Sequence, residues 1–215
     1  MLSSVSQEWK ISSLTESSDH SDWTSLIDLI KYRANYQAKQ TAFIFLQNGK
    51  NESSRLTYQE LDQQAQKLAV YLQNLTQSGD RILLLYPPGL DFIIAFFACL
   101  YAGVIAIPLY PPRPNRSINR IKAIIANAEV KIGLSTTEAF PQIERRFTDN
   151  RELSVLSWLT SDNLPETSEP VPVSREINQN TLALLQYTSG STGQPKGVMV
   201  SHGNILHNCR YSVSK

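Results

Sequence analysis

The hydrophobic positions of this chain follow two different periods, and their alternation predicts the order of its helices and strands. Apolar residues recur every three or four positions over 22–34, 57–75 and 117–128, a pattern typical of amphipathic helices. Short unbroken apolar runs lie between and after these segments, as in strands that are buried on both faces of a sheet. The predicted strands are 41–46, 81–86, 104–107, 131–134, 153–156, 182–185 and 198–200.

The helix at 57–75 has a well-marked start. Thr57 and Glu60 have the spacing of a capping box, and Leu56 and Leu61 have the spacing of a hydrophobic staple. The remaining apolar residues continue along one face of this helix. We therefore expect it to be structural.

Residues 92–107 are almost continuously apolar and allow two interpretations. A membrane-spanning helix needs about 20 apolar residues, whereas this run is bounded by Asp91 and Pro108 and interrupted by Gly103. A helix over 90–102 that ends at Gly103, followed by a strand over 104–107, fits the same residues better. We expect no membrane insertion.

The alternation of strands and helices indicates an α/β fold with a mostly parallel sheet flanked by helices. Residues 1–21 are rich in serine and weakly apolar, so we expect a disordered leader there. The domain then begins at residue 22. Ligands of open parallel sheets lie at the carboxyl ends of the strands, which directs attention to the residues that follow 182–185.

Residues 187–197 read Tyr-Thr-Ser-Gly-Ser-Thr-Gly-Gln-Pro-Lys-Gly. Glycines let the backbone approach a ligand and turn its N–H groups towards it, while hydroxyls and a lysine ammonium suit an anion with many oxygens. This composition predicts a polyphosphate site. The candidate binding residues are Thr188, Ser189, Gly190, Ser191, Thr192, Gly193 and Lys196.

Two better-known functional loops of similar composition do not match residues 187–197. A Walker loop needs lysine directly after glycine and directly before a hydroxyl residue, whereas Lys196 lies between Pro195 and Gly197. A nucleophile elbow needs Gly-x-Ser-x-Gly, which neither Ser189 nor Ser191 satisfies. A flexible Ser/Gly connection is the remaining alternative, and the attached Pro-Lys-Gly argues against it.

Residues 188–197 resemble the signature loop of adenylate-forming enzymes, which include acyl-CoA synthetases, luciferases and the adenylation domains of peptide synthetases. The resemblance implies that the loop holds the β- and γ-phosphates of ATP while a carboxylate attacks the α-phosphorus. It implies ATP and Mg²⁺ as cofactors, with the magnesium ligand expected beyond residue 215. Lys196 is expected to offset phosphate charge, and no other catalytic residue is assigned in this chain.

Further stretches resemble fatty acyl-AMP ligases in particular: 85–113, and 185–187 with 198–208 on either side of the loop. That family converts a fatty acid into its adenylate and passes the acyl group to a phosphopantetheinylated acyl carrier protein, for polyketide, lipopeptide or lipid synthesis. The resemblance covers nearly everything after about residue 22. A long-chain acyl-CoA synthetase or a peptide-synthetase adenylation domain is the alternative, because each shares the first half-reaction.

The family's later motifs do not occur before Lys215. They include the adenine- and ribose-binding segments and the C-terminal domain with its catalytic lysine. We therefore expect 22–215 to be an incomplete N-terminal AMP-binding domain, inactive in adenylation by itself. A truncated remnant that only binds a partner is an alternative of another class.

Charge and cysteine content narrow the range of binding partners and cellular compartments. The formal net charge is +1, with scattered basic residues, so there is no electrostatic case for nucleic-acid binding. Cys99 and Cys209 do not form a disulfide framework, which favours a reducing, cytoplasmic compartment, and Cys99 is expected to pack in the core. The histidines do not have zinc spacing. His202 is expected to be structural rather than to touch a ligand.

Overall fold

The computed structural model describes residues 23–112, 118–148, 156–164, 175–189 and 195–213. The expected leader and the loop residues Gly190, Ser191, Thr192 and Gly193 lie outside the described residues. The strands are β1 Thr41–Gln47, β2 Asn51–Thr57, β3 Arg81–Leu85, β4 Ile105–Leu109, β5 Ile132–Ser135, β6 Ser157–Thr160, β7 Leu182–Ser189 and β8 Pro195–Ser201. The helices are α1 Leu26–Tyr36, α2 Tyr58–Leu75, α3 Leu90–Ala102, α4 Asn119–Ala128, α5 Phe140–Thr148 and α6 His202–Val213.

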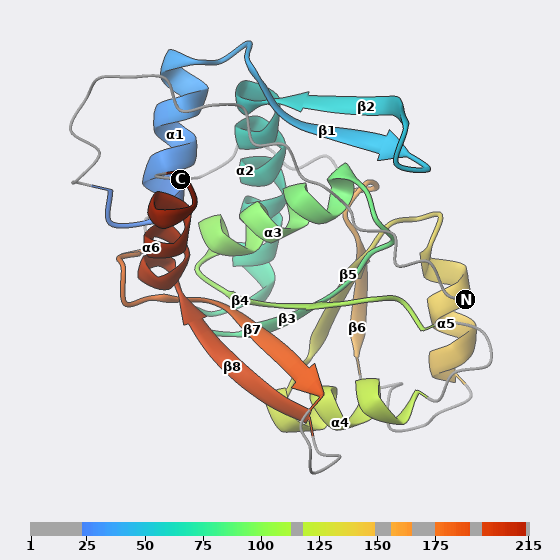
Figure 1. The fold of residues 1–215 in the computed structure, drawn as a ribbon. Coiled ribbons are helices and arrows are strands. Elements are labelled where there is room, and N and C mark those ends of the chain that lie inside the picture. Colours follow the sequence, from blue (N-terminus) through green and yellow to red (C-terminus); the bar gives the residue numbers. More distant parts are fainter. Residues whose placement is uncertain (1–22, 113–117, 149–155, 165–174, 190–194, 214–215) are drawn as a thin grey trace.

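One sheet has the strand order β6-β5-β3-β4-β7-β8. All of its neighbouring strands are parallel except β7 and β8, which are antiparallel. Figure 1 shows α2 and α3 above these strands and α4 below them. The predicted α/β fold with a mostly parallel sheet is therefore confirmed.

The central strand β3 explains why its sequence is a continuous apolar run. Ile82 and Leu84 lie in a hydrophobic cluster with residues of α2 and α3. Leu83 and Leu85 lie in a second cluster, with residues of α4 and α5. Side chains alternate along a strand, so each face of the sheet takes two of these residues. All four are completely buried.

The helix α3 has the bounds that the sequence predicts, and it ends at Gly103. This residue adopts a left-handed conformation with φ 65°, which favours glycine. Its N–H donates to the carbonyl of Leu100, and the N–H of Val104 donates to the carbonyl of Cys99, each over 3.0 Å. Within the described part of the chain, no helix is both long and apolar enough to cross a membrane.

The capping box of α2 is also confirmed. The N–H of Glu60 donates to the Thr57 hydroxyl over 3.2 Å, and the N–H of Thr57 donates to the Glu60 carboxylate over 2.8 Å. This second bond, followed by one from the Thr57 hydroxyl, holds the pKa of Glu60 below its ordinary value. Local sequence alone determines this helix start.

The sequence pattern does not predict β2. Asn48 and Gly49, a dipeptide typical of hairpin turns, both adopt left-handed conformations. However, β2 is polar and mostly exposed, and among the described strands it pairs only with β1. It therefore has no apolar pattern from which a strand could be predicted.

The predicted strand at 153–156 can be compared only at Leu156, because residues 153–155 lie outside the described residues. Leu156 is not in a strand, and β6 begins at Ser157. The pairing with β5 sets this register, with Ile132 opposite Ser157 and Gly133 opposite Trp158. The Trp158 ring lies where a side chain on Gly133 would be. The apolar residue Leu156 is buried, but it precedes the strand.

Candidate functional site

The site is built on the hairpin of β7 and β8. Its strands are longer than the sequence predicts, because antiparallel pairing continues to Ser189 and Pro195. Thr188 and Lys196 therefore lie directly opposite each other as a cross-strand pair, and such partners have Cβ atoms about 4.5–5.5 Å apart. Of the predicted site residues, the structure places Thr188, Ser189 and Lys196, and it brings Thr188 and Lys196 together.

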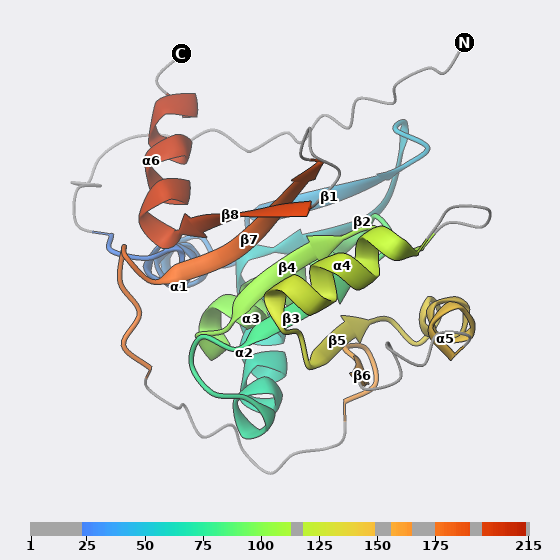
Figure 2. The ribbon, with the colours of Figure 1, turned by 90° about the horizontal axis from the view of Figure 1, so that it is seen from below.

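The hairpin ends at the carboxyl edge of the sheet. β7 runs parallel to β4, with Leu184 opposite Ala106, so Thr188 and Ser189 lie at the carboxyl end of their strand. Figures 1 and 2 show the far end of the hairpin beside α4. This position agrees with the expectation that ligands of open parallel sheets lie at this edge.

Thr188 and Lys196 are both exposed, and within the described part of the chain Lys196 has no ion pair. A hydroxyl and an ammonium that face solvent side by side can both donate hydrogen bonds to one anionic ligand. Charge-assisted bonds of this kind contribute about 1.5–3 kcal/mol each. The arrangement suits phosphate oxygens.

The residue before this pair, Tyr187, is 5% exposed. Its hydroxyl donates to Oδ1 of Asn127 in α4 over 2.6 Å. Burial raises the pKa of the Tyr187 hydroxyl, so the group is protonated at neutral pH and can act as the donor. The sequence gives no signal for Asn127, because an isolated asparagine on a helix belongs to no motif.

Gly197 is the cross-strand partner of Tyr187. A Cβ atom at Gly197 would be 2.9 Å from Cζ of the Tyr187 ring, closer than such atoms are found. The glycine of the Pro-Lys-Gly sequence is therefore required for the close approach of the Tyr187 ring. It is not required for its backbone conformation, because its φ is not positive. The ring fills the space that a side chain would take.

His202 begins α6 directly after β8. It is 1% exposed, and its Nδ1 accepts a hydrogen bond from the N–H of Leu26 over 3.2 Å. Burial lowers the pKa of His202 to about 4, although Asp28 acts in the opposite direction. The imidazole is therefore neutral and satisfies an N–H group at the start of α1. The structure supports the structural interpretation of this residue.

Cys99 lies in the core, as expected. It is completely buried in the cluster between the sheet and its α2–α3 layer, and burial raises the pKa of its thiol. A thiol that does not ionise is a weak nucleophile. Among the described residues, no three His, Cys, Asp or Glu side chains are grouped so that they could hold a metal ion.

Comparison with known proteins places the chain in a family. The family model described as AMP-binding enzyme matches residues 30–214. The medium-chain-fatty-acid–[acyl-carrier-protein] ligase JamA of Moorena producens is 43% identical over 194 residues, with 88% of this chain and 33% of the relative covered. The long-chain-fatty-acid–AMP ligase FadD32 of Mycolicibacterium smegmatis is 32% identical over 191 residues, with 87% and 30% covered.

A solved structure of a fatty acid ligase is also similar to this chain. The fatty acid AMP ligase from Legionella pneumophila superposes with a TM-score of 0.76 and 37% sequence identity, covering 88% of this chain and 32% of that protein. The chain thus spans about a third of the length of the proteins that it matches.

The buried His202 predicts a stability that falls in acid. An unfolded histidine titrates near pH 6.5, whereas the pKa of His202 is about 4 in the folded protein. Between these values the unfolded state binds more protons, so the free energy of unfolding decreases as the pH decreases. The contribution is present above about pH 6.5 and is lost as the pH falls through about 4, amounting to at most about 3 kcal/mol.

Denaturant unfolding at several pH values from 4 to 7 measures this slope. His202→Gln removes the titration and is expected to flatten the curve, whereas the matched variant His207→Gln is expected to keep it. The imidazole NMR signals of the unchanged protein provide an independent measurement. Protonation of His202 with a midpoint near 6.5 in the folded state would contradict the prediction.

Proposed function

The chain belongs to the AMP-binding enzyme family, and on that premise we propose that it is part of a fatty acyl-AMP ligase. The observation that carries the proposal is the pair of Thr188 and Lys196, opposite each other on a hairpin at the carboxyl edge of a parallel sheet. The relatives named as fatty acid ligases support the substrate class. Because the chain spans about a third of their length, the activity belongs to the whole protein.

The proposed reaction has two steps. An oxygen of the fatty carboxylate bonds to the α-phosphorus of ATP, and the bond from this phosphorus to the β-phosphate oxygen breaks, which releases pyrophosphate. The acyl group of the adenylate then passes to the thiol of a phosphopantetheinylated acyl carrier protein, with AMP as the leaving group. Catalysis of the first step depends mainly on positioning and on stabilising the charge of the departing phosphates.

The hairpin residues serve the first step. Lys196 offsets negative charge on the β- and γ-phosphates, and the Thr188 hydroxyl donates a hydrogen bond to their oxygens. We assign Ser189, Gly190, Ser191, Thr192 and Gly193 to the same phosphate site on sequence grounds. Mg²⁺ prefers several oxygen ligands in octahedral geometry. On the resemblance to adenylate-forming enzymes, we propose that its protein ligand lies beyond residue 215.

The acceptor distinguishes this proposal from an acyl-CoA synthetase. The name of the relative JamA specifies an acyl carrier protein, and we propose the same class of acceptor here. The test incubates the full-length protein with ATP and fatty acids of several chain lengths, and offers either free CoA or a phosphopantetheinylated carrier protein. We expect acyl transfer to the carrier and little acyl-CoA. Efficient acyl-CoA formation would assign the protein to the rival class.

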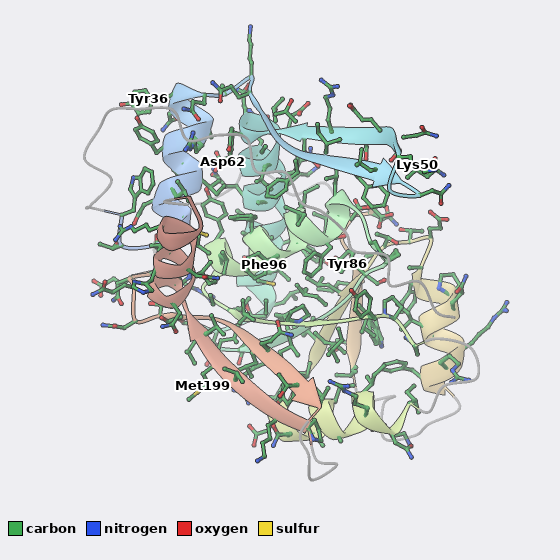
Figure 3. All side chains as sticks on the ribbon, viewed as in Figure 1. Tyr36, Lys50, Asp62, Tyr86, Phe96 and Met199 are labelled. Carbon is green, nitrogen blue, oxygen red and sulfur yellow. The ribbon has the colours of Figure 1, made fainter. Side chains whose placement is uncertain are left out.

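Replacement of Lys196 by alanine tests the phosphate site. The side chain is exposed, so we expect the full-length Lys196→Ala protein to fold normally. Loss of one charge-assisted interaction, about 1.5–3 kcal/mol, lowers the rate of pyrophosphate exchange roughly 10- to 100-fold. Lys50→Ala is a matched control, because Figure 3 shows Lys50 at the tip of the β1–β2 hairpin. An unchanged exchange rate in Lys196→Ala would remove the phosphate role.

We further propose that residues 1–215 alone do not catalyse adenylation, because they span about a third of the ligases that they match. The alternative of another class is a protein that only binds a partner. Pyrophosphate exchange with the purified chain measures this directly. We expect no fatty-acid-dependent exchange above background, and turnover would refute the proposal.

A further inference from the structure

The hairpin that carries Thr188 and Lys196 joins the rest of the sheet through β7. The register of β7 on β4 has Leu184 opposite Ala106. β7 pairs with β8 from Leu182 to Ser189, and β8 is the last strand of the sheet. The register position on β4 therefore lies several residues before Thr188. Contacts outside the strand ladder also bear on where the end of the hairpin lies.

Tyr187 makes such a contact. Its ring lies in the hydrophobic cluster that joins the sheet to α4 and α5, and its hydroxyl donates to Asn127 of α4 over 2.6 Å. A guanidinium nitrogen of Arg120, also in α4, donates to the Tyr187 carbonyl over 3.4 Å. On its other side the ring contacts Gly197 of β8. One side chain thus connects both strands of the hairpin to the same helix.

The position of Tyr187 in the sequence gives this contact a consequence for the site. Tyr187 is adjacent to Thr188, and its cross-strand partner Gly197 is adjacent to Lys196. Neighbouring side chains of a strand point to opposite faces. The buried ring therefore holds one face of the hairpin, while Thr188 and Lys196 are exposed. A shift of the ring moves both residues of the pair together.

We propose that Tyr187 is a positioning residue, which holds Thr188 and Lys196 at the sheet edge through its hydrogen bond to Asn127 and thereby sets the affinity for ATP. The inference rests on the proposed function. It assigns Tyr187 no contact with substrate.

Tyr187→Phe isolates the hydrogen bond, because the ring and its apolar contacts remain. A neutral hydrogen bond contributes about 0.5–1.5 kcal/mol. We expect the KM for ATP in the full-length protein to rise about three- to tenfold, with the KM for the fatty acid unchanged. Asn127→Ala removes the acceptor and has the same effect. The double variant is no worse than either single variant, because both remove one interaction.

Tyr101→Phe is the matched control. The Tyr101 hydroxyl also donates to a side chain, that of Asp62, but it joins α3 to α2 on the other face of the sheet; Figure 3 shows Asp62 on α2. This variant loses a tyrosine hydrogen bond with no expected change in the KM for ATP. If Tyr187→Phe and Tyr101→Phe have the same kinetic constants, the inference is overturned.

Hydrogen–deuterium exchange separates this inference from the proposed function. In Tyr187→Phe, the backbone amides of 185–189 and 196–198 are expected to exchange faster than in the unchanged protein, and in Tyr101→Phe they are not. If the full-length protein forms no adenylate from any fatty acid, the proposed function fails. The exchange data alone then decide whether the hydrogen bond holds the hairpin, and equal exchange in Tyr187→Phe and the unchanged protein overturns the inference.

Discussion

The two-sided burial of β3 is the constraint on which the rest of the fold depends. Its apolar side chains are completely buried, Ile82 and Leu84 towards α2 and α3, and Leu83 and Leu85 towards α4 and α5. Such a strand is stable only when helices cover both faces of the sheet and parallel neighbours satisfy its backbone. The helices α2, α3, α4 and α5 provide this cover. Because β4 is parallel to both β3 and β7, the carboxyl ends of these three strands lie at one edge of the sheet.

The hairpin of β7 and β8 belongs to the same sheet, but it is less buried than β3. At the edge, β8 is not covered as β3 is: its middle residues are exposed. This exposure is what allows Lys196 to be a charged, accessible donor, whereas the buried imidazole of His202 is neutral. An exposed charge is strongly screened by water, so the phosphate site that we propose needs more donors than Lys196 alone. In that proposal the position of the hairpin matters, because it determines where Thr188 and Lys196 lie.

The sequence predicts features that local interactions determine. The bounds of α3, its end at Gly103 and the capping box of Thr57 and Glu60 all follow from residues within one helix and its ends. The polar strand β2 and the bounds of β6 could not be predicted, because pairing with a neighbouring strand determines them. The loop composition indicated a phosphate site. It could not show that Thr188 and Lys196 are cross-strand partners, since this depends on how far the hairpin pairing continues.

Contacts between distant segments hold both ends of the hairpin, and the sequence does not reveal them. At one end the Tyr187 hydroxyl bonds to Asn127. At the other, β8 leads directly into α6, where His202 bonds to the backbone of Leu26 in α1. Both contacts join residues more than 50 positions apart, so they form only when the sheet and its helices are assembled. The position of Thr188 and Lys196 therefore depends on the packing of α1 and α4 and not on the hairpin sequence alone.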